Sequence, residues 1–117
     1  MNSFDPPIEH LQLIVNLFNN GKLEQALTES KTLLEKFPNS VFLHNIAGAS
    51  NTGLKQFDNA IKSYKKAIKI NPDFAEAYYN MAIAQKVIGE FEEAIKSYKK
   101  ALKLSLIHIS EPTRRRG

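Results

Sequence analysis

The sequence predicts an all-α solenoid, in which three antiparallel helix pairs wind into a right-handed superhelix. The octapeptide AIKSYKKA occurs at residues 60–67 and again, letter for letter, at residues 94–101, which sets a repeat length of 34. Within each copy, apolar residues recur three and four positions apart, the spacing of one face of an amphipathic helix. One helix pair cannot bury its apolar face alone, so we expect the three copies to stack on one another.

The 34-residue period divides the chain into repeats of two helices each. Proline occupies the same repeat position at Pro38 and Pro72, where it is expected to end the second helix of the first two copies. From the repeat length and these prolines we expect an N-terminal cap at residues 1–6 and three repeats at residues 7–40, 41–74 and 75–104, the third of them truncated. A non-native tail is expected at residues 105–117.

The first copy diverges most from the other two but stays in register. Its Ala26 aligns with Ala60 of the second copy after a shift of 34 residues. Asp5 followed by Pro6 is typical of a helix start, with a capping side chain and a first-turn proline. We therefore expect the first helix to begin directly after Asp5.

The second copy departs from the pattern at the turn between its helices. Lys55 stands where the other copies have Gly21 and Gly89, the position at which a glycine ends the helix in a left-handed conformation. A left-handed lysine costs about 1 kcal/mol. Alternatively, Gly53 ends the helix early. The sequence leaves both options open.

The third copy shows the helical pattern most clearly. Its first helix is expected over residues 75–87, preceded by DFAE at 73–76, which has the form of a capping box with Asp73 as the cap. Gly89 then breaks the helix. The next helix carries an apolar stripe at helical spacing, which we expect to be buried: Phe91, Ala94, Ile95, Tyr98, Ala101 and Leu102.

Together these residues resemble the tetratricopeptide repeat family, whose signature combines small residues, aromatic residues and a closing proline at fixed positions. The resemblance covers about residues 7–104. Ile14, Ser30 and Leu33 depart from the family pattern in the first copy, as terminal repeats often do. The matching residues are Gly21, Leu23, Ala26 and Pro38; Gly48, Phe57, Ala60, Tyr64, Ala67 and Pro72; and Tyr78, Met81, Ala82, Gly89, Phe91, Ala94, Tyr98 and Ala101.

The resemblance implies a non-catalytic protein-interaction module. In that family the first helix of each pair lines a concave groove that binds an extended peptide or a partner helix. An alternative interpretation is that several of these side chains only pack between adjacent first helices. Ile8 is expected to face the groove, together with a set of residues that we call the predicted groove: Leu11, Gln12, Val15 and Asn19; Phe42, Asn45, Ile46, Ala49 and Thr52; and Glu76, Tyr79, Asn80, Ile83 and Lys86.

The resemblance also implies what the groove does not bind. Members that hold chaperone tails use a clamp of Lys, Asn, Asn, Lys and Arg for the terminal carboxylate. None of the corresponding residues matches, so we expect no carboxylate clamp here; they are Leu11, Val15, Ile46, Glu76 and Asn80.

Composition narrows the remaining function classes. The chain has no cysteine, which excludes disulfides and thiolate chemistry, and its three histidines lie far apart, with His44 at a packing position. We expect no metal, no cofactor and no enzymatic activity. The lysines of the second helices form two matched sets, but glutamates dilute them and no aromatics interleave on that face, so we expect no nucleic-acid binding. An RNA-binding solenoid remains an alternative that salt dependence would reveal.

The N-terminus lacks the basic start and the unbroken apolar stretch of a signal peptide, and no apolar run is long enough to span a membrane. We therefore expect a cytoplasmic protein. A second hypothesis for its function is that the repeats are the substrate-docking arm of a larger sulfotransferase or glycosyltransferase whose catalytic domain is missing.

The C-terminal stretch LSLIHISEPTRRRG breaks the repeat. Ser105 and Leu106 stand where Asn71 and Pro72 stood one period earlier, and the part SLIHIS alternates in a strand-like way. A capping extension and a basic tail ending at Arg114–Arg116 are two interpretations. The third is that Leu104–Arg114 resembles translated sequencing-adaptor DNA. The chain would then be a truncated reading of a longer environmental gene, and Ile95 and Leu102, exposed or covered by Leu106–Ile109, would promote self-association.

Overall fold

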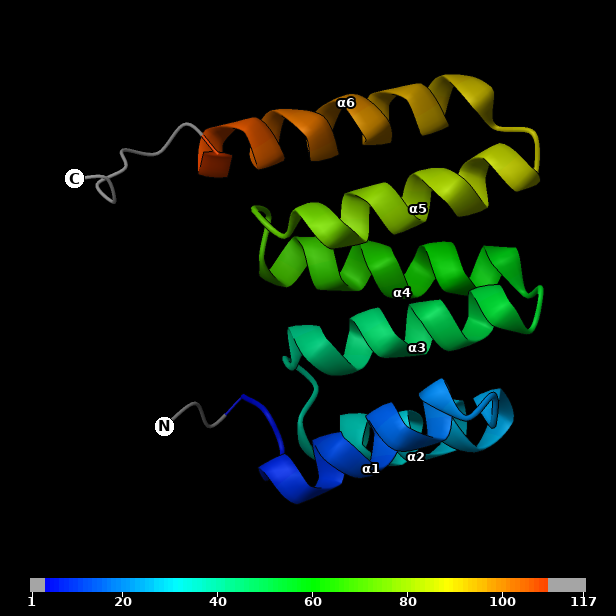
Figure 1. The fold of residues 1–117 in the computed structure, drawn as a ribbon, viewed down its shortest axis with the longest axis vertical. Helices are drawn as coiled ribbons and strands as arrows, with labels where there is room; N and C mark the ends of the chain where they lie inside the picture. Colours follow the sequence, from blue (N-terminus) through cyan, green and yellow to red (C-terminus); the bar gives the residue numbers. More distant parts are fainter. Residues whose placement is uncertain (1–3, 110–117) are drawn as a thin grey trace.

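The structure is a computed structural model that describes residues 4–109, with side chains as far as Ile107. Over these residues it contains six helices and no strand, as the all-α prediction requires. Figure 1 shows the helices stacked along the long axis, with α1 and α2 at one end and α6 at the other. The helices are α1 (Ile8–Asn19), α2 (Leu23–Lys36), α3 (Val41–Gly53), α4 (Phe57–Ile70), α5 (Ala75–Val87) and α6 (Phe91–Ile109).

Each helix packs against its neighbours in the chain, and α3 also contacts α5 directly. One core cluster lies between α4 and α5 and centres on Tyr64, which is 1% exposed. A second cluster joins α1, α2 and α3 around Ile14, Ala26 and Leu43. Each cluster is therefore formed between neighbouring helices, as expected for helix pairs that bury their apolar faces against one another.

Gly48 on α3 is the residue that lets the Tyr64 ring approach the helix backbone. A Cβ placed at Gly48 would lie 2.6 Å from Cε1 of Tyr64, which is closer than real contacts allow. Gly48 matches the family pattern, and the close approach of the Tyr64 ring is the steric reason for a glycine at this position. The ring fills the space that the absent side chain leaves between α3 and α4.

Lys55 takes the left-handed conformation, and this decides the question that the sequence left open. Its φ is 65°, close to the 78° of Gly21 and the 88° of Gly89 at the same repeat position. Helix α3 extends through Gly53, so Gly53 does not end the helix early. A Cβ at Gly53 would meet Cδ1 of the Leu23 side chain on α2, so a larger residue there would require that side chain to shift.

Replacing Lys55 with glycine should raise the free energy of unfolding by about 0.5–1 kcal/mol, because glycine adopts this φ without the steric cost that a side chain meets. Urea denaturation monitored by circular dichroism measures the change. The control is Gly89→Ala, which should lower stability by a similar amount, since no atom lies within 4 Å of the added methyl and only backbone strain remains. A loss of stability in Lys55→Gly would contradict the prediction.

Two predicted helix caps are wrong. The N-cap of α1 is Pro7, which has no side chain able to cap. Asp5 instead accepts a hydrogen bond from the hydroxyl of Ser40, and the same Ser40 oxygen caps α3 by accepting the backbone N–H of Leu43 at 3.2 Å. The N-cap of α5 is Phe74 rather than Asp73. Prolines end the helices as predicted, because α2 and α4 stop before Pro38 and Pro72.

The strand-like alternation of SLIHIS does not produce a strand among the described residues of that stretch. Helix α6 continues without a break through Ile109, while residues 110–117 lie outside the described part of the chain. No proline stands at the position where α4 ended, and extending a formed helix by one residue is easy compared with starting one. Among the described residues of this segment, Leu106 and Ile107 are exposed.

The apolar stripe of α6 is only half buried. Ala94 and Ala101 pack against α5, as predicted, but Phe91, Ile95 and Leu102 are more than half exposed. We call these three residues the outer face of α6. Their equivalents one repeat earlier are in the core or packed against it, because α5 covers α4. Nothing in the described chain covers α6 in the same way.

Candidate functional site

The residues of the predicted groove lie on α1, α3 and α5, and none of them is fully buried. The exposed members are Gln12, Asn19, Glu76, Tyr79 and Lys86. The half-buried members are Leu11, Val15, Phe42, Asn45, Ile46, Ala49, Thr52, Asn80 and Ile83.

The fold brings the α3 and α5 parts of this set together, because α3 and α5 are in direct contact. Helix α1 packs mainly against α2, so its four members lie toward one end of the surface. Leu11, Phe42 and Ile46 pack against the cluster formed by Ile14, Ala26 and Leu43. For these three, the packing interpretation accounts for at least part of the side chain.

Two polar members of the predicted groove on α3 differ in how they are bonded. The hydroxyl of Thr52 donates to the carbonyl oxygen of Gly48 at 2.9 Å and also hydrogen-bonds Tyr64, so it supports the core. The Oδ1 atom of Asn45 is buried, yet no described residue donates a hydrogen bond to it. A buried acceptor without a donor costs about 1–3 kcal/mol, so Asn45 is not explained by stability.

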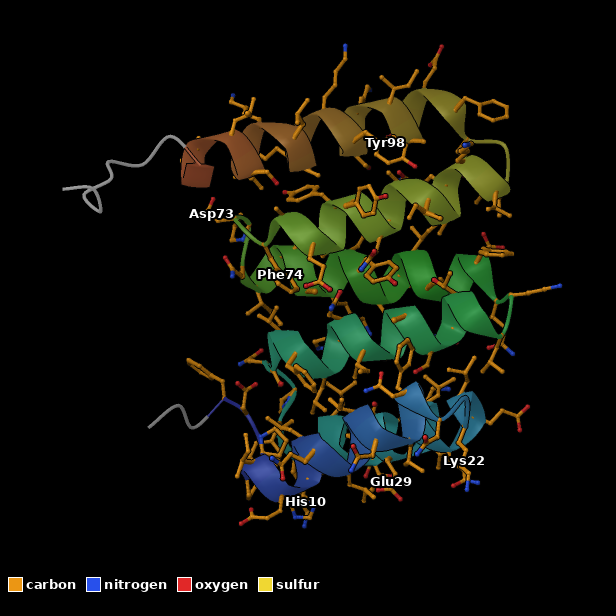
Figure 2. The ribbon with its side chains drawn as sticks, in the orientation of Figure 1. His10, Lys22, Glu29, Asp73, Phe74 and Tyr98 are labelled. Atoms are coloured by element: carbon orange, nitrogen blue, oxygen red, sulfur yellow. The ribbon has the colours of Figure 1, made fainter. Side chains whose placement is uncertain are left out.

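A pocket of about 550 Å³ opens where the predicted groove meets α6. Its lining includes Glu76 and Tyr79 from the predicted groove, together with Tyr98, Leu102 and Ser105 from α6. The rings of Tyr79 and Tyr98 meet edge to face, with centroids 5.7 Å apart. Figure 2 shows Tyr98 on the side of α6 that faces α5. Most of the lining is apolar, so the pocket suits an apolar or aromatic side chain.

The α6 residues of this pocket were not predicted as site residues. Tyr98 and Leu102 were assigned to a buried stripe, and Ser105 to the tail. Periodicity places all three on one face of a helix but does not reveal whether a neighbour covers that face. One repeat earlier the equivalent surface is filled, since Val41 and Ile68 pack around the core cluster together with Phe74 of the next helix pair.

The titration of three side chains reflects burial. Burial raises the pKa of the Tyr64 phenol, with a smaller contribution in the same direction from Glu76. Burial likewise raises the pKa of Tyr78, and the charge of Asp73 adds to it. His44, 8% exposed and therefore packed as predicted, has its pKa lowered chiefly by burial and also by Lys66, against the hydrogen bond to Pro38.

Between residues 4 and 109 no three acidic or histidine side chains gather closely enough to hold a metal ion. No helix in the same range has both the length and the apolar character that crossing a bilayer requires.

Two models of known protein families match the second half of the chain. The model described as "TPR repeat" matches residues 53–86, and the model described as "Tetratricopeptide repeat" matches residues 75–105. The second match spans nearly the same residues as the third expected copy.

Among curated proteins, the peroxisomal targeting signal receptor of Candida glabrata is 30% identical over 89 residues, which cover 76% of this chain and 15% of the receptor. A probable UDP-N-acetylglucosamine–peptide N-acetylglucosaminyltransferase of Arabidopsis thaliana is 34% identical over 80 residues, covering 68% of this chain and 8% of that protein. The chain thus spans only a small part of the length of either relative.

A solved structure confirms the fold. The second TPR of Spaghetti (RPAP3), bound to an HSP90 peptide, superimposes with a TM-score of 0.80 at 18% identity, covering 83% of this chain and 90% of that one. At this identity the likeness concerns the arrangement of helices and not the ligand.

Proposed function

Because this chain belongs to the tetratricopeptide repeat family, we propose that it is a non-catalytic interaction module that binds a peptide or a partner helix on the surface formed by α3, α5 and α6. The observation that carries the proposal is the apolar pocket beside Tyr79 and Tyr98, which continues the α5 part of the predicted groove. An aromatic pair lining a concave apolar site, here exposed Tyr79 and half-buried Tyr98, is a common anchor for a partner side chain.

The relatives support a peptide as the ligand class. The Candida glabrata relative, 30% identical, is named as a receptor for a targeting signal. Chaperone tails are not favoured as the ligand, because Leu11, Ile46 and Glu76 stand at clamp positions where lysine or asparagine would be needed to hold a terminal carboxylate. Nucleic-acid binding is likewise not favoured, and a cytoplasmic location remains a prediction from the sequence.

The comparisons do not favour the second hypothesis, a docking arm of a sulfotransferase or glycosyltransferase. The likeness to the Arabidopsis transferase covers only 8% of that protein. The proposed recognition uses the pocket and its aromatic pair and needs no catalytic group.

Immobilised peptide arrays with random extended sequences test the proposal. We expect the chain to retain a subset of peptides with an apolar or aromatic anchor, and we expect Tyr79→Ala to weaken their binding about tenfold, as loss of an aromatic anchor does. A matched control is Lys62→Ala on the exposed side of α4, which should leave binding unchanged. If no peptide is retained above background, or if Tyr79→Ala binds as well as the unchanged chain, the proposal is wrong.

A substitution at Asn45 should affect peptide binding more than it affects stability. Asn45→Ala should lower the free energy of unfolding by no more than about 1 kcal/mol, since the lost Oδ1 atom has no donor in the described chain. It should weaken peptide binding about five- to tenfold, the effect of losing one amide hydrogen bond to an extended backbone. Titration calorimetry measures affinity and urea denaturation measures stability. Asn59→Ala on α4 is the control, and unchanged affinity in Asn45→Ala would remove Asn45 from the site.

We also propose that the chain self-associates through the outer face of α6. Phe91, Ile95 and Leu102 are exposed on one face at helical spacing, beside the same pocket. Exposed apolar residues gathered in this way are typical of an interface. Peptide binding and self-association would then compete for the α5–α6 surface.

A further inference from the structure

A second pocket, of about 500 Å³, lies between the α2–α3 turn and α4. It shares no residue with the predicted groove. Apolar side chains such as Leu34 and Ile70 form part of its wall. Its polar lining consists of Asn39, His44, Lys66 and Lys69. We call it the basic pocket.

The two lysines of the basic pocket have no acidic side chain beside them in the pocket. Over the described residues neither Lys66 nor Lys69 forms an ion pair. Nε2 of His44 lies 2.8 Å from the carbonyl oxygen of Pro38 and must donate to it, because a carbonyl accepts only. A bound anion would therefore meet two ammonium groups and an imidazole that is able to gain a proton.

The repeat provides an internal comparison one period later. Asn39 corresponds to Asp73, His44 to Tyr78, and Lys66 to Lys100. At that second junction the Lys100 ammonium lies 6.0 Å from the centre of the Tyr78 ring, and the Asp73 carboxylate is close enough to raise the pKa of Tyr78. The second junction thus has a carboxylate and an aromatic ring of the chain itself at these positions, whereas the first junction has an asparagine and a histidine there.

We propose that the basic pocket binds an acidic peptide segment, with an aspartate or glutamate side chain between Lys66, Lys69 and His44 and an adjacent apolar side chain against Ile70. The lysines supply the charge complementarity, and the apolar wall selects an anion that carries hydrocarbon next to its charge. This site is separate from the peptide surface on α3, α5 and α6. A partner that contacts both would be held at two places.

His44 reports on this site directly, through the NMR signal of its Cε1 proton during a pH titration of the whole chain. Adding acetyl-Leu-Glu-Leu-Glu-amide should raise the midpoint of the His44 titration by about half a pH unit or more, because a nearby carboxylate favours the imidazolium. Exposed His10 should not move. The charged groups facing His44 in the pocket are Lys66 and Lys69 of α4; the lining residues from α2 and the turn are uncharged.

Two probes separate the possible outcomes. Acetyl-Leu-Gln-Leu-Gln-amide, which has no charge, should leave His44 unchanged. Inorganic phosphate at equal concentration should give a smaller shift than the acidic peptide. A shift that is absent, that is shared by His10, or that phosphate reproduces in full would overturn the proposal, in the last case in favour of a plain oxyanion site.

Variants that copy residues of the second junction complete the test. Asn39→Asp introduces the carboxylate that Asp73 supplies one repeat later, so the fold should tolerate it, and it should weaken acidic-peptide binding at least about fivefold. Lys66→Gln with Lys69→Gln should do the same. The control pair Lys100→Gln with Lys103→Gln should leave binding unchanged. Asn45→Ala should also leave it unchanged, which distinguishes failure of this site from failure of the groove.

Discussion

Replacing Tyr64 with alanine should lower the free energy of unfolding by about 3–5 kcal/mol, the usual cost of removing a buried aromatic ring. Tyr64 is 1% exposed and lies at the centre of the α4–α5 core cluster, against Gly48. Tyr98 occupies the same position of an identical octapeptide but is only half buried. Tyr98→Ala should therefore cost much less, about 1–2 kcal/mol.

Urea denaturation of both variants tests this difference. Small domains have only about 5–15 kcal/mol of stability, so Tyr64→Ala risks unfolding the chain. Tyr64→Phe is the milder companion variant: it keeps the ring, loses the hydrogen bond with Thr52, and should cost about 1 kcal/mol. Equal losses for Tyr64→Ala and Tyr98→Ala would contradict the packing described for the two helices.

Replacing Ile95 and Leu102 together with glutamine should abolish concentration-dependent self-association. The two side chains are 52% and 60% exposed and form most of the outer face of α6. Burial of apolar area drives association, at about 25 cal/mol per Å² of apolar surface removed from water. Sedimentation equilibrium over a wide range of protein concentration measures the effect.

A matched pair controls for the number of substitutions. Lys96→Gln with Lys99→Gln changes two other exposed positions of α6 and should leave self-association intact. The Ile95/Leu102 double variant should also retain the stability of the folded chain, because neither side chain belongs to the core. A chain that stays monomeric at all concentrations before any substitution would show that the outer face of α6 is not an interface of this protein.

The helical pattern of the sequence was sufficient to predict most of the fold. Spacing located the helices, the prolines located two helix ends, and Gly89 was correctly expected in a left-handed turn. The wrongly predicted helix cap at Asp5 rests on a local sequence signal that a contact with a distant residue overrides. Asp5 looks like a cap for α1, but its carboxylate bonds Ser40 at the start of α3, a contact 35 residues away that no local pattern reveals.

The candidate sites were less predictable than the fold. The repeat predicted groove positions on the first helices, and those residues lie on α1, α3 and α5. It did not show that Thr52 is bonded into the core while Asn45 has a buried acceptor without a donor among the described residues. The pocket beside Tyr79 and the basic pocket each combine residues from separate helices. Such sites depend on how helices pack, and helix-face patterns carry little information about it.

The octapeptide AIKSYKKA separates what local sequence specifies from what packing specifies. Both copies are helical, one in α4 and the other in α6, because helix formation depends on residues within a few positions of each other. Their burial differs: Ile61 is 7% exposed and Ile95 is 52% exposed, although their flanking letters are identical. The neighbour α5 covers α4, whereas the described chain places nothing over α6, so contact with another helix pair determines which copy belongs to the core and which is available to a partner.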